Sequence, residues 1–170
     1  MRLRHEHMLK ELEPLIAQYA RSRETMFKSL ALLDEAQVRE LLPGREWSVQ
    51  DTLAHLATNQ DLMTDLLSEI ISGSRRALAD DFDNQRFNDD QVARGRAKSV
   101  QALRADLDSG YARLIAVLET VTAETIHRRG THPAVGDADV KEFFLGMYAH
   151  HEMHCRDVVE QARRLKKAVK

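Results

Sequence analysis

The chain has 170 residues, 43% of them hydrophobic and 31% charged, with a formal net charge of −2. This composition is typical of a globular domain, and it excludes the strong basic field that a nucleic-acid-binding surface requires. We therefore expect a single domain over residues 1–170 that binds no nucleic acid.

Only seven glycines and three prolines interrupt the chain, and long stretches without either residue favour helices. The first predicted helix spans residues 9–33, where apolar side chains recur at helical spacing. Pro14 fits this helix only in its first turn, because proline lacks the amide hydrogen that later turns need. Residues 34–42 predict a short extra turn, which Pro43 and Gly44 end.

The second predicted helix begins at Ser48 and runs to Gly73. Ser48 and Asp51 have the spacing of a capping box, with aspartate in place of the usual glutamate. Gly73 is a suitable stop, because glycine adopts the left-handed conformation that ends many helices. Trp47 lies just before this helix, where we interpret it as a packing residue that seals the helix start rather than as a substrate-stacking residue.

The remaining chain predicts two loops and two helices. Residues 74–87 show no clear period and predict a loop, and residues 88–121 predict a third helix. Gly95 and Gly110 each weaken that helix by about 1 kcal/mol, so neighbouring elements must hold it in place. Residues 131–139 predict a second loop before the last helix.

The last predicted helix starts after Asp139, a good N-cap residue that has Glu142 three positions later. Four helices of this length predict an all-α four-helix bundle. The loop between the second and third helices is long enough to cross the bundle, so the topology need not be a simple up-and-down one.

The strongest chemical signal is a pair of histidines on the last helix. His150 and His154 are four residues apart, so both side chains project from one helix face. Such a pair can bind one metal ion through its ring nitrogens. His55 on the second helix is placed to be a third ligand, and Asn59, one turn later, would line the same pocket. Three protein ligands leave a position open for water or substrate, as in catalytic metal sites.

Neighbouring residues leave open which side chains of the last helix would bind the metal. His151 lies nearest the centre of the apolar stripe on the last helix, so a pair of His151 and His154 is an alternative to the pair of His150 and His154. Cys155 is a further potential ligand, because a thiolate binds zinc well. The simpler interpretation of Cys155 is a small buried hydrophobic residue.

Cys155 is also the only cysteine, so no intramolecular disulfide can form and a reducing compartment is expected. The first residues lack the apolar core of a signal peptide. No apolar run approaches the ~20 residues that span a bilayer. We therefore expect a cytoplasmic protein with no membrane partner.

Two motifs resemble a known family. The segment EWSVQDTLAHL, residues 46–56, resembles the W-S-x-x-D-x-L-x-H-L signature of the DinB-like superfamily. The segment HHEMHCRDV, residues 150–158, resembles the closing H-x-x-x-H motif of that family. Between them, Phe87-Asn88 and the leucines that follow Ser99 are similar to the third helix of DinB/DfsB-type members.

The resemblance implies a homodimeric four-helix bundle with a long crossover and a bound divalent metal ion, zinc or nickel first and iron or manganese next. The positions that match the ligands are His55, His150 and His154. Asp157 matches an acidic position that follows the last ligand in the related mycothiol-dependent maleylpyruvate isomerases, which implies that it orients a ligand histidine. In those isomerases a glutamate stands where this chain has His150.

Two functions of different class are consistent with these residues. The first is a metal-dependent enzyme that transfers a low-molecular-weight thiol to a small reactive electrophile, or that hydrolyses such a molecule. The second is a non-catalytic, stress-related helical dimer or binding module with a structural metal or none. The number of protein ligands on the metal distinguishes the two functions, because four protein ligands favour a structural metal and an open position favours catalysis.

Overall fold

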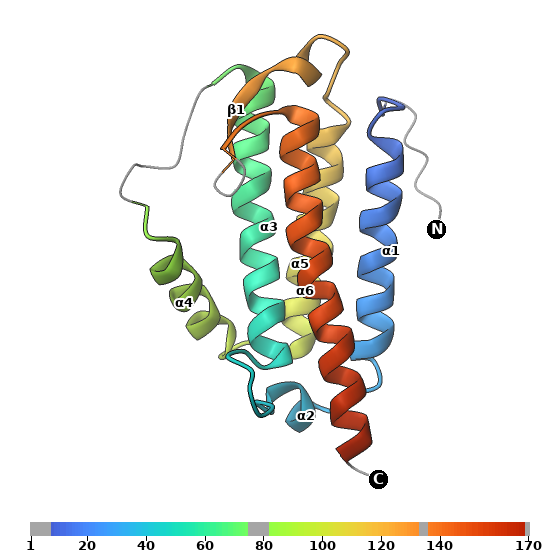
Figure 1. Ribbon diagram of the computed structural model, residues 1–170, viewed down its shortest axis with the longest axis vertical. Coiled ribbons are helices and arrows are strands. Elements are labelled where there is room, and N and C mark those ends of the chain that lie inside the picture. The colour runs from blue at the N-terminus through green and yellow to red at the C-terminus, as the bar shows by residue number, and fades with distance from the viewer. Residues whose placement is uncertain (1–7, 75–81, 133–135, 169–170) are drawn as a thin grey trace.

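The computed structural model describes residues 8–74, 82–132 and 136–168. Four long helices form a bundle (Figure 1): α1 (Glu13–Leu30), α3 (Val49–Ser72), α5 (Val100–Leu118) and α6 (Val140–Ala168). This arrangement confirms the predicted all-α four-helix bundle. In the described part of the chain, no helix combines the length and the apolar character needed to cross a membrane.

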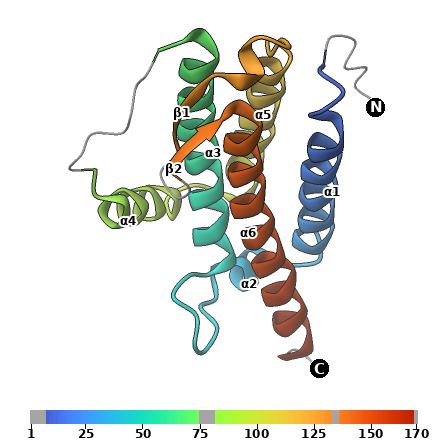
Figure 2. The ribbon, with the colours of Figure 1, turned by 45° about the horizontal axis from the view of Figure 1, so that its top comes forward.

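The order of the helices in space differs from their order in the chain. α1 packs along α6, and α3 packs along both α5 and α6. α1 and α6 run in one direction and α3 and α5 in the other, as the colours of Figures 1 and 2 show. Because α3 and α5 are parallel, the chain must return along the bundle between them. α4 (Asn84–Gly95) lies in this return, against α3, so the predicted crossover is confirmed.

Local sequence signals set the ends of α3 and the start of α6 as predicted. The Ser48 hydroxyl accepts from the Asp51 amide, and the Asp51 carboxylate accepts from the Ser48 amide, so the capping box is present. Gly73 follows α3 in the left-handed conformation, with φ 86°. Asp139 and Glu142 make the same reciprocal pair of hydrogen bonds at the start of α6.

The first helix is shorter than predicted. α1 spans Glu13–Leu30 instead of residues 9–33, with Pro14 in its first turn as expected. The predicted extra turn is the short helix α2 (Glu35–Arg39), which a capping box between Asp34 and Gln37 begins.

The prediction of a single helix over residues 88–121 is wrong, because two helices, α4 and α5, occupy this region. α4 ends at Gly95, and Ser99 caps the start of α5. The Gln50 side chain stabilises the break by donating to three carbonyl groups, those of Gly95, Arg96 and Lys98. A Cβ at Gly95 would overlap the Cβ of Ala54, so α4 packs this closely on α3 only with glycine at that position.

The two predicted loops also contain regular structure. α4 begins at Asn84 rather than at residue 88, because the Asp83 carboxylate accepts from an amide of its first turn. Residues 75–81 of the first loop, with Arg75, Arg76, Asp80 and Asp81, lie outside the described residues.

The second loop contains an antiparallel hairpin that the sequence did not predict. Its strands are β1 (Arg129–His132) and β2 (Gly136–Asp139), and they follow the short 3-10 helix Thr125–His127. Both strands are short and polar, so they lack the alternation of apolar residues that marks a strand in sequence.

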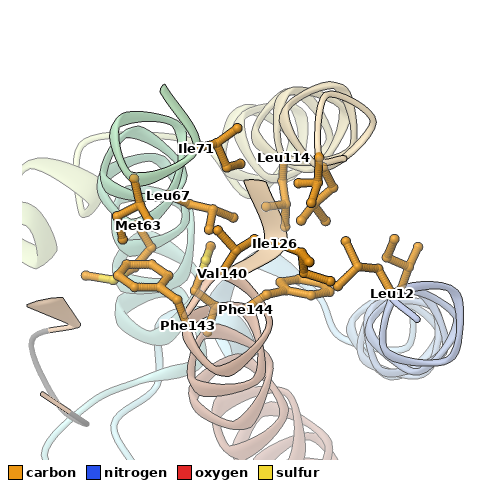
Figure 3. Close-up of a cluster of buried hydrophobic side chains, with 14 of the residues drawn as sticks. Leu12, Met63, Leu67, Ile71, Leu114, Ile126, Val140, Phe143 and Phe144 are labelled. Atoms are coloured by element: carbon orange, nitrogen blue, oxygen red, sulfur yellow. The ribbon is translucent and has the colours of Figure 1, made fainter. Parts of the chain in front are cut away.

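Two clusters of buried apolar side chains fill the bundle. Figure 3 shows part of the first, where Phe143 and Phe144 of α6 lie among side chains of α1, α3 and α5. The second cluster lies further along α6 and includes Cys155 and Val158. On α6 the first cluster ends at Met147. The histidines of α6 therefore lie between two apolar layers, which fix the rotation of that helix.

Asp51 joins the start of α3 to the end of α4. Its side chain is 5% exposed and forms an ion pair with Arg96 at 2.8 Å. Burial raises the pKa of Asp51, but the hydrogen bonds from Arg96 and Ser48 outweigh this effect and bring the pKa below 3.8. The ionised carboxylate is therefore stabilised by the fold.

We expect Asp51→Asn to lower the free energy of unfolding at pH 7 by about 1–3 kcal/mol, because charged hydrogen bonds to a buried carboxylate are lost. A depressed pKa gives stability that is present above pH 3.8 and lost as the pH falls through the folded value. The difference between wild type and variant in urea melts should therefore shrink below about pH 4.

The matched control for this prediction is Asp106→Asn. Asp106 pairs with Lys98, and both side chains are about half exposed (42% and 50%). Exposed pairs contribute about 0–1 kcal/mol. Equal losses in the two variants, or a loss at Asp51 that does not change with pH, would contradict the role given to the Asp51 carboxylate.

Candidate metal centre

Three histidines from two helices meet between α3 and α6. His55 lies in the second turn of α3, and His150 and His154 lie one turn apart on α6. The Nε2 atoms of His55 and His150 are 3.1 Å apart, and the ring centroids of the three pairs are 4.6–5.1 Å apart. One nitrogen from each ring lies within 4.8 Å of the other two. The three residues proposed from sequence are therefore brought together.

Two of the three histidines, His55 and His154, are held in their neutral form. His55 is 4% exposed, and burial lowers its pKa to about 3, with further lowering by His154 and His150. Burial also lowers the pKa of His154, although nearby Asp157 opposes this effect. A neutral imidazole has the free lone pair that a metal ligand needs. At pH 7 these two rings are therefore ready to bind a cation without first losing a proton.

The Trp47 side chain packs against two of the three histidines. The Trp47 ring lies 4.8 Å from the His55 ring and 5.9 Å from the His154 ring, measured between centroids. Trp47 thus packs at the start of α3, as predicted, and it also covers one side of the histidine cluster. It shields two of the three rings from water on that side.

Asp157 lies on the outer side of His154. Its Oδ2 is 3.9 Å from the His154 Nδ1, which is buried and has no hydrogen-bond partner among the described residues. Arg45 donates to the Asp157 Oδ1 at 3.1 Å and also pairs with Glu160 at 2.9 Å. Asp157 is therefore held near the His154 Nδ1, the kind of ring nitrogen that carboxylates contact in metal sites, without a hydrogen bond between the two. The orienting role expected of Asp157 stays a prediction.

Asn88 of α4 is a neighbour of the site that we did not predict. Its hydrogen bonding opposes the lowered pKa of His55, which places the amide beside that ring. Its Oδ1 is buried but has no partner of good geometry in the described structure. No sequence signal marks Asn88 as a site residue, because its position depends on how the crossover packs against α3.

The potential ligands on α6 lie on two different faces of that helix. His151 and Cys155, the alternative ligands, are each 2% exposed and face α1, where the His151 ring stacks on Tyr19 with centroids 4.0 Å apart. The structure therefore pairs His150, and not His151, with His154. Asn59 is half-buried one turn after His55 and is not among the residues whose ligand atoms converge.

Cys155 fits its simpler interpretation. Burial raises the pKa of its thiol to about 12, so the free thiol is not a reactive nucleophile at neutral pH. The other histidine whose surroundings are described, His127, is exposed.

The residues present fit a divalent cation. Three imidazoles suit zinc, nickel, copper and iron, and three protein ligands leave at least one position free. The unpartnered His154 Nδ1 and Asn88 Oδ1 lie at the edge of the cluster. Such atoms provide the outer hydrogen bonds that orient metal-binding histidines.

We expect Asp157→Asn to weaken zinc binding by about tenfold, because it removes the negative charge 3.9 Å from the His154 Nδ1, and outer carboxylates of this kind strengthen metal-ligand histidines. Competition with a chromophoric chelator at pH 7 measures this change. Asp65→Asn is the control, because Asp65 is an exposed α3 carboxylate that pairs with Arg113. Unchanged zinc affinity in Asp157→Asn would show that the carboxylate has no part in the site.

A known protein family and solved structures share this fold and motif pattern. The sequence model of the DinB superfamily matches residues 18–158. The chain belongs to the DinB superfamily. Among solved structures, this DinB-superfamily chain is similar to YfiT from Bacillus subtilis, described as a probable metal-dependent hydrolase with an unusual four-helix bundle topology. The TM-score is 0.76 at 18% identity, over 98% of this chain and 94% of YfiT.

A second similar structure is the mycothiol-dependent maleylpyruvate isomerase, with a TM-score of 0.72 and 19% identity. A mutant of that isomerase matches equally well, at 18% identity. The match covers 86% of this chain but only 60% of the isomerase. No curated protein matches the chain. At these identities the likeness establishes a shared fold, and the activities named belong to those proteins.

Proposed function

We propose that this protein is a metal-dependent enzyme that transfers a low-molecular-weight thiol to a small reactive electrophile, or hydrolyses such a molecule. One observation carries the proposal, which is the convergence of His55, His150 and His154 from α3 and α6. Three ligands with an open position are typical of catalytic metal sites.

A divalent ion at this site would lower the pKa of a bound water or thiol and polarise an electrophile. The chain's own residues have separate tasks. The three histidines would hold the ion, and Asp157, which Arg45 holds 3.9 Å from the His154 Nδ1, would orient the His154 ring. Trp47 covers two of the rings and limits the access of water on that side.

The solved structures give this proposal its reaction classes. YfiT is described as a probable metal-dependent hydrolase, and the isomerase depends on the thiol mycothiol. Both share the bundle in which the present histidines meet. Zinc or nickel is the first metal to test, with iron and manganese next, because imidazole ligands suit several of these ions.

The structure also bears on the alternative of a purely structural metal. A structural zinc site takes four protein ligands, and within the described residues the converging set contains three. His151 and Cys155, which would supply a fourth ligand, are turned toward α1. This arrangement favours the catalytic interpretation.

The test is an activity assay on untagged protein loaded with zinc or nickel. A chromogenic aryl chloride with a small thiol reports thiol transfer, and a nitrophenyl ester reports hydrolysis. We expect one of these activities to disappear after treatment with a chelator and to return when the metal is restored. Protein that binds the metal but accelerates neither reaction above free metal would contradict the proposed reaction classes.

A further inference from the structure

The inward face of α6 carries a second group of potential metal ligands, separate from the three converging histidines. Cys155 Sγ lies 3.2 Å from the Nε2 of His151, one turn earlier on the same helix. The same sulfur lies 3.6 Å from the Sδ of Met26 on α1. An imidazole, a thiol and a thioether therefore meet in the interface between α1 and α6.

All three side chains are removed from water. Met26 is fully buried, and His151 and Cys155 are each 2% exposed. The His151 ring is held parallel to the Tyr19 ring, with 15° between their planes. This stacking fixes the direction in which the Nε2 points. The other ring nitrogen, Nδ1, is buried without a hydrogen-bond partner in the described part of the chain.

We propose that Met26, His151 and Cys155 form a binding site for a soft monovalent metal ion, with monovalent copper as the natural occupant. Thiolate and thioether ligands select monovalent copper over hard divalent ions. Ligand atoms that share one ion at 2.0–2.3 Å lie about 3–4 Å apart, and the two separations seen here are in that range.

The charge balance suits a buried site. Binding replaces the proton on the Cys155 sulfur with the metal ion, and the proton leaves to solvent, so no electron is transferred. One thiolate, one neutral imidazole, one thioether and one monovalent cation have no net charge. A neutral group avoids the large cost of burying an isolated charge.

The structure also provides a way in. Cys155 lines a cavity of about 560 Å³ between α1 and α6, together with Ser22 and Tyr148. Of the three proposed ligands, Cys155 is the one that lines this cavity, and Met26 and His151 are buried next to its sulfur. The histidine cluster of the other site faces α3, so the two sites have no ligand in common.

The test is an oxygen-free titration of the full, untagged chain with monovalent copper, in competition with a chromophoric copper(I) chelator. The histidine cluster is first saturated with zinc. We expect wild type to retain about one copper ion per chain, and X-ray absorption to show sulfur in its first shell. Met26→Leu, which conserves volume and fold, should weaken retention by at least about tenfold, and Cys155→Ala should abolish it.

His127→Ala is the matched control, because His127 is exposed and belongs to neither proposed metal site. It should retain copper as wild type does. The proposal is overturned if wild type retains no copper, if the first shell contains no sulfur, or if Met26→Leu and wild type hold copper equally. Met26→Leu keeps the test decisive even if Cys155→Ala fails to fold.

Discussion

Replacement of His154 by alanine should remove the divalent metal and leave the bundle folded. The change deletes one of three ligands, so we expect affinity for zinc to fall by more than about 100-fold, since even outer partners of a ligand are worth roughly 10–100-fold. The His154 Nδ1 has no partner among the described residues, so few stabilising hydrogen bonds are lost. Metal analysis after dialysis and a far-ultraviolet circular dichroism melt measure the two effects.

The control for this experiment is His127→Ala, because His127 is exposed in the 3-10 helix far along the chain from the cluster. It should keep its metal and its melting temperature. If His154→Ala retains the metal as wild type does, the ion is bound elsewhere. If the metal-free variant no longer folds, His154 has a structural role that the described contacts do not show.

The largest loss of stability is expected from Phe144→Ala. Phe144 is fully buried in the first apolar cluster, and its ring stacks on Tyr19 with centroids 6.2 Å apart. Truncation of a buried phenylalanine costs about 3–5 kcal/mol, because apolar contacts are lost and a cavity remains. For a chain of this size the melting temperature should fall by about 10 °C.

Leu145→Ala provides the comparison, because Leu145 is the next residue on α6 and is 49% exposed. Its effect should stay within about 0.5 kcal/mol, as is usual for surface substitutions. Similar melting temperatures for the two variants would show that the first cluster does not anchor α6. A partly stable Phe144→Ala protein should also bind metal less tightly, since the same helix presents His150 and His154.

The helices and their ends could be predicted where the signal is local. Ser48 and Gly73 bound α3 as expected, and Asp139 starts α6, because capping depends on residues only a few positions apart. The converging histidines could be predicted for a similar reason. His150 and His154 share a helix face by their spacing, and only the contact of that face with His55 required the third dimension.

What the sequence could not provide depends on packing between distant segments. α4 and α5 read as one helix, because the carbonyl groups at the break are satisfied by Gln50, which is far away in the chain. The position of His151 at the centre of the apolar stripe correctly indicated burial. The buried face of α6 that carries His151 packs on α1, however, whereas the histidines that converge with His55 lie on the face toward α3. The place of Asn88 beside His55 follows from the crossover and has no local signature.

The most direct test of the metal site is elemental analysis of untagged protein combined with X-ray absorption at the edge of the bound metal. The arrangement of His55, His150 and His154 predicts about one divalent ion per chain, surrounded by nitrogen and oxygen neighbours only. Protein that contains no metal and takes up neither zinc nor nickel, or a divalent ion with sulfur in its first shell, would contradict it.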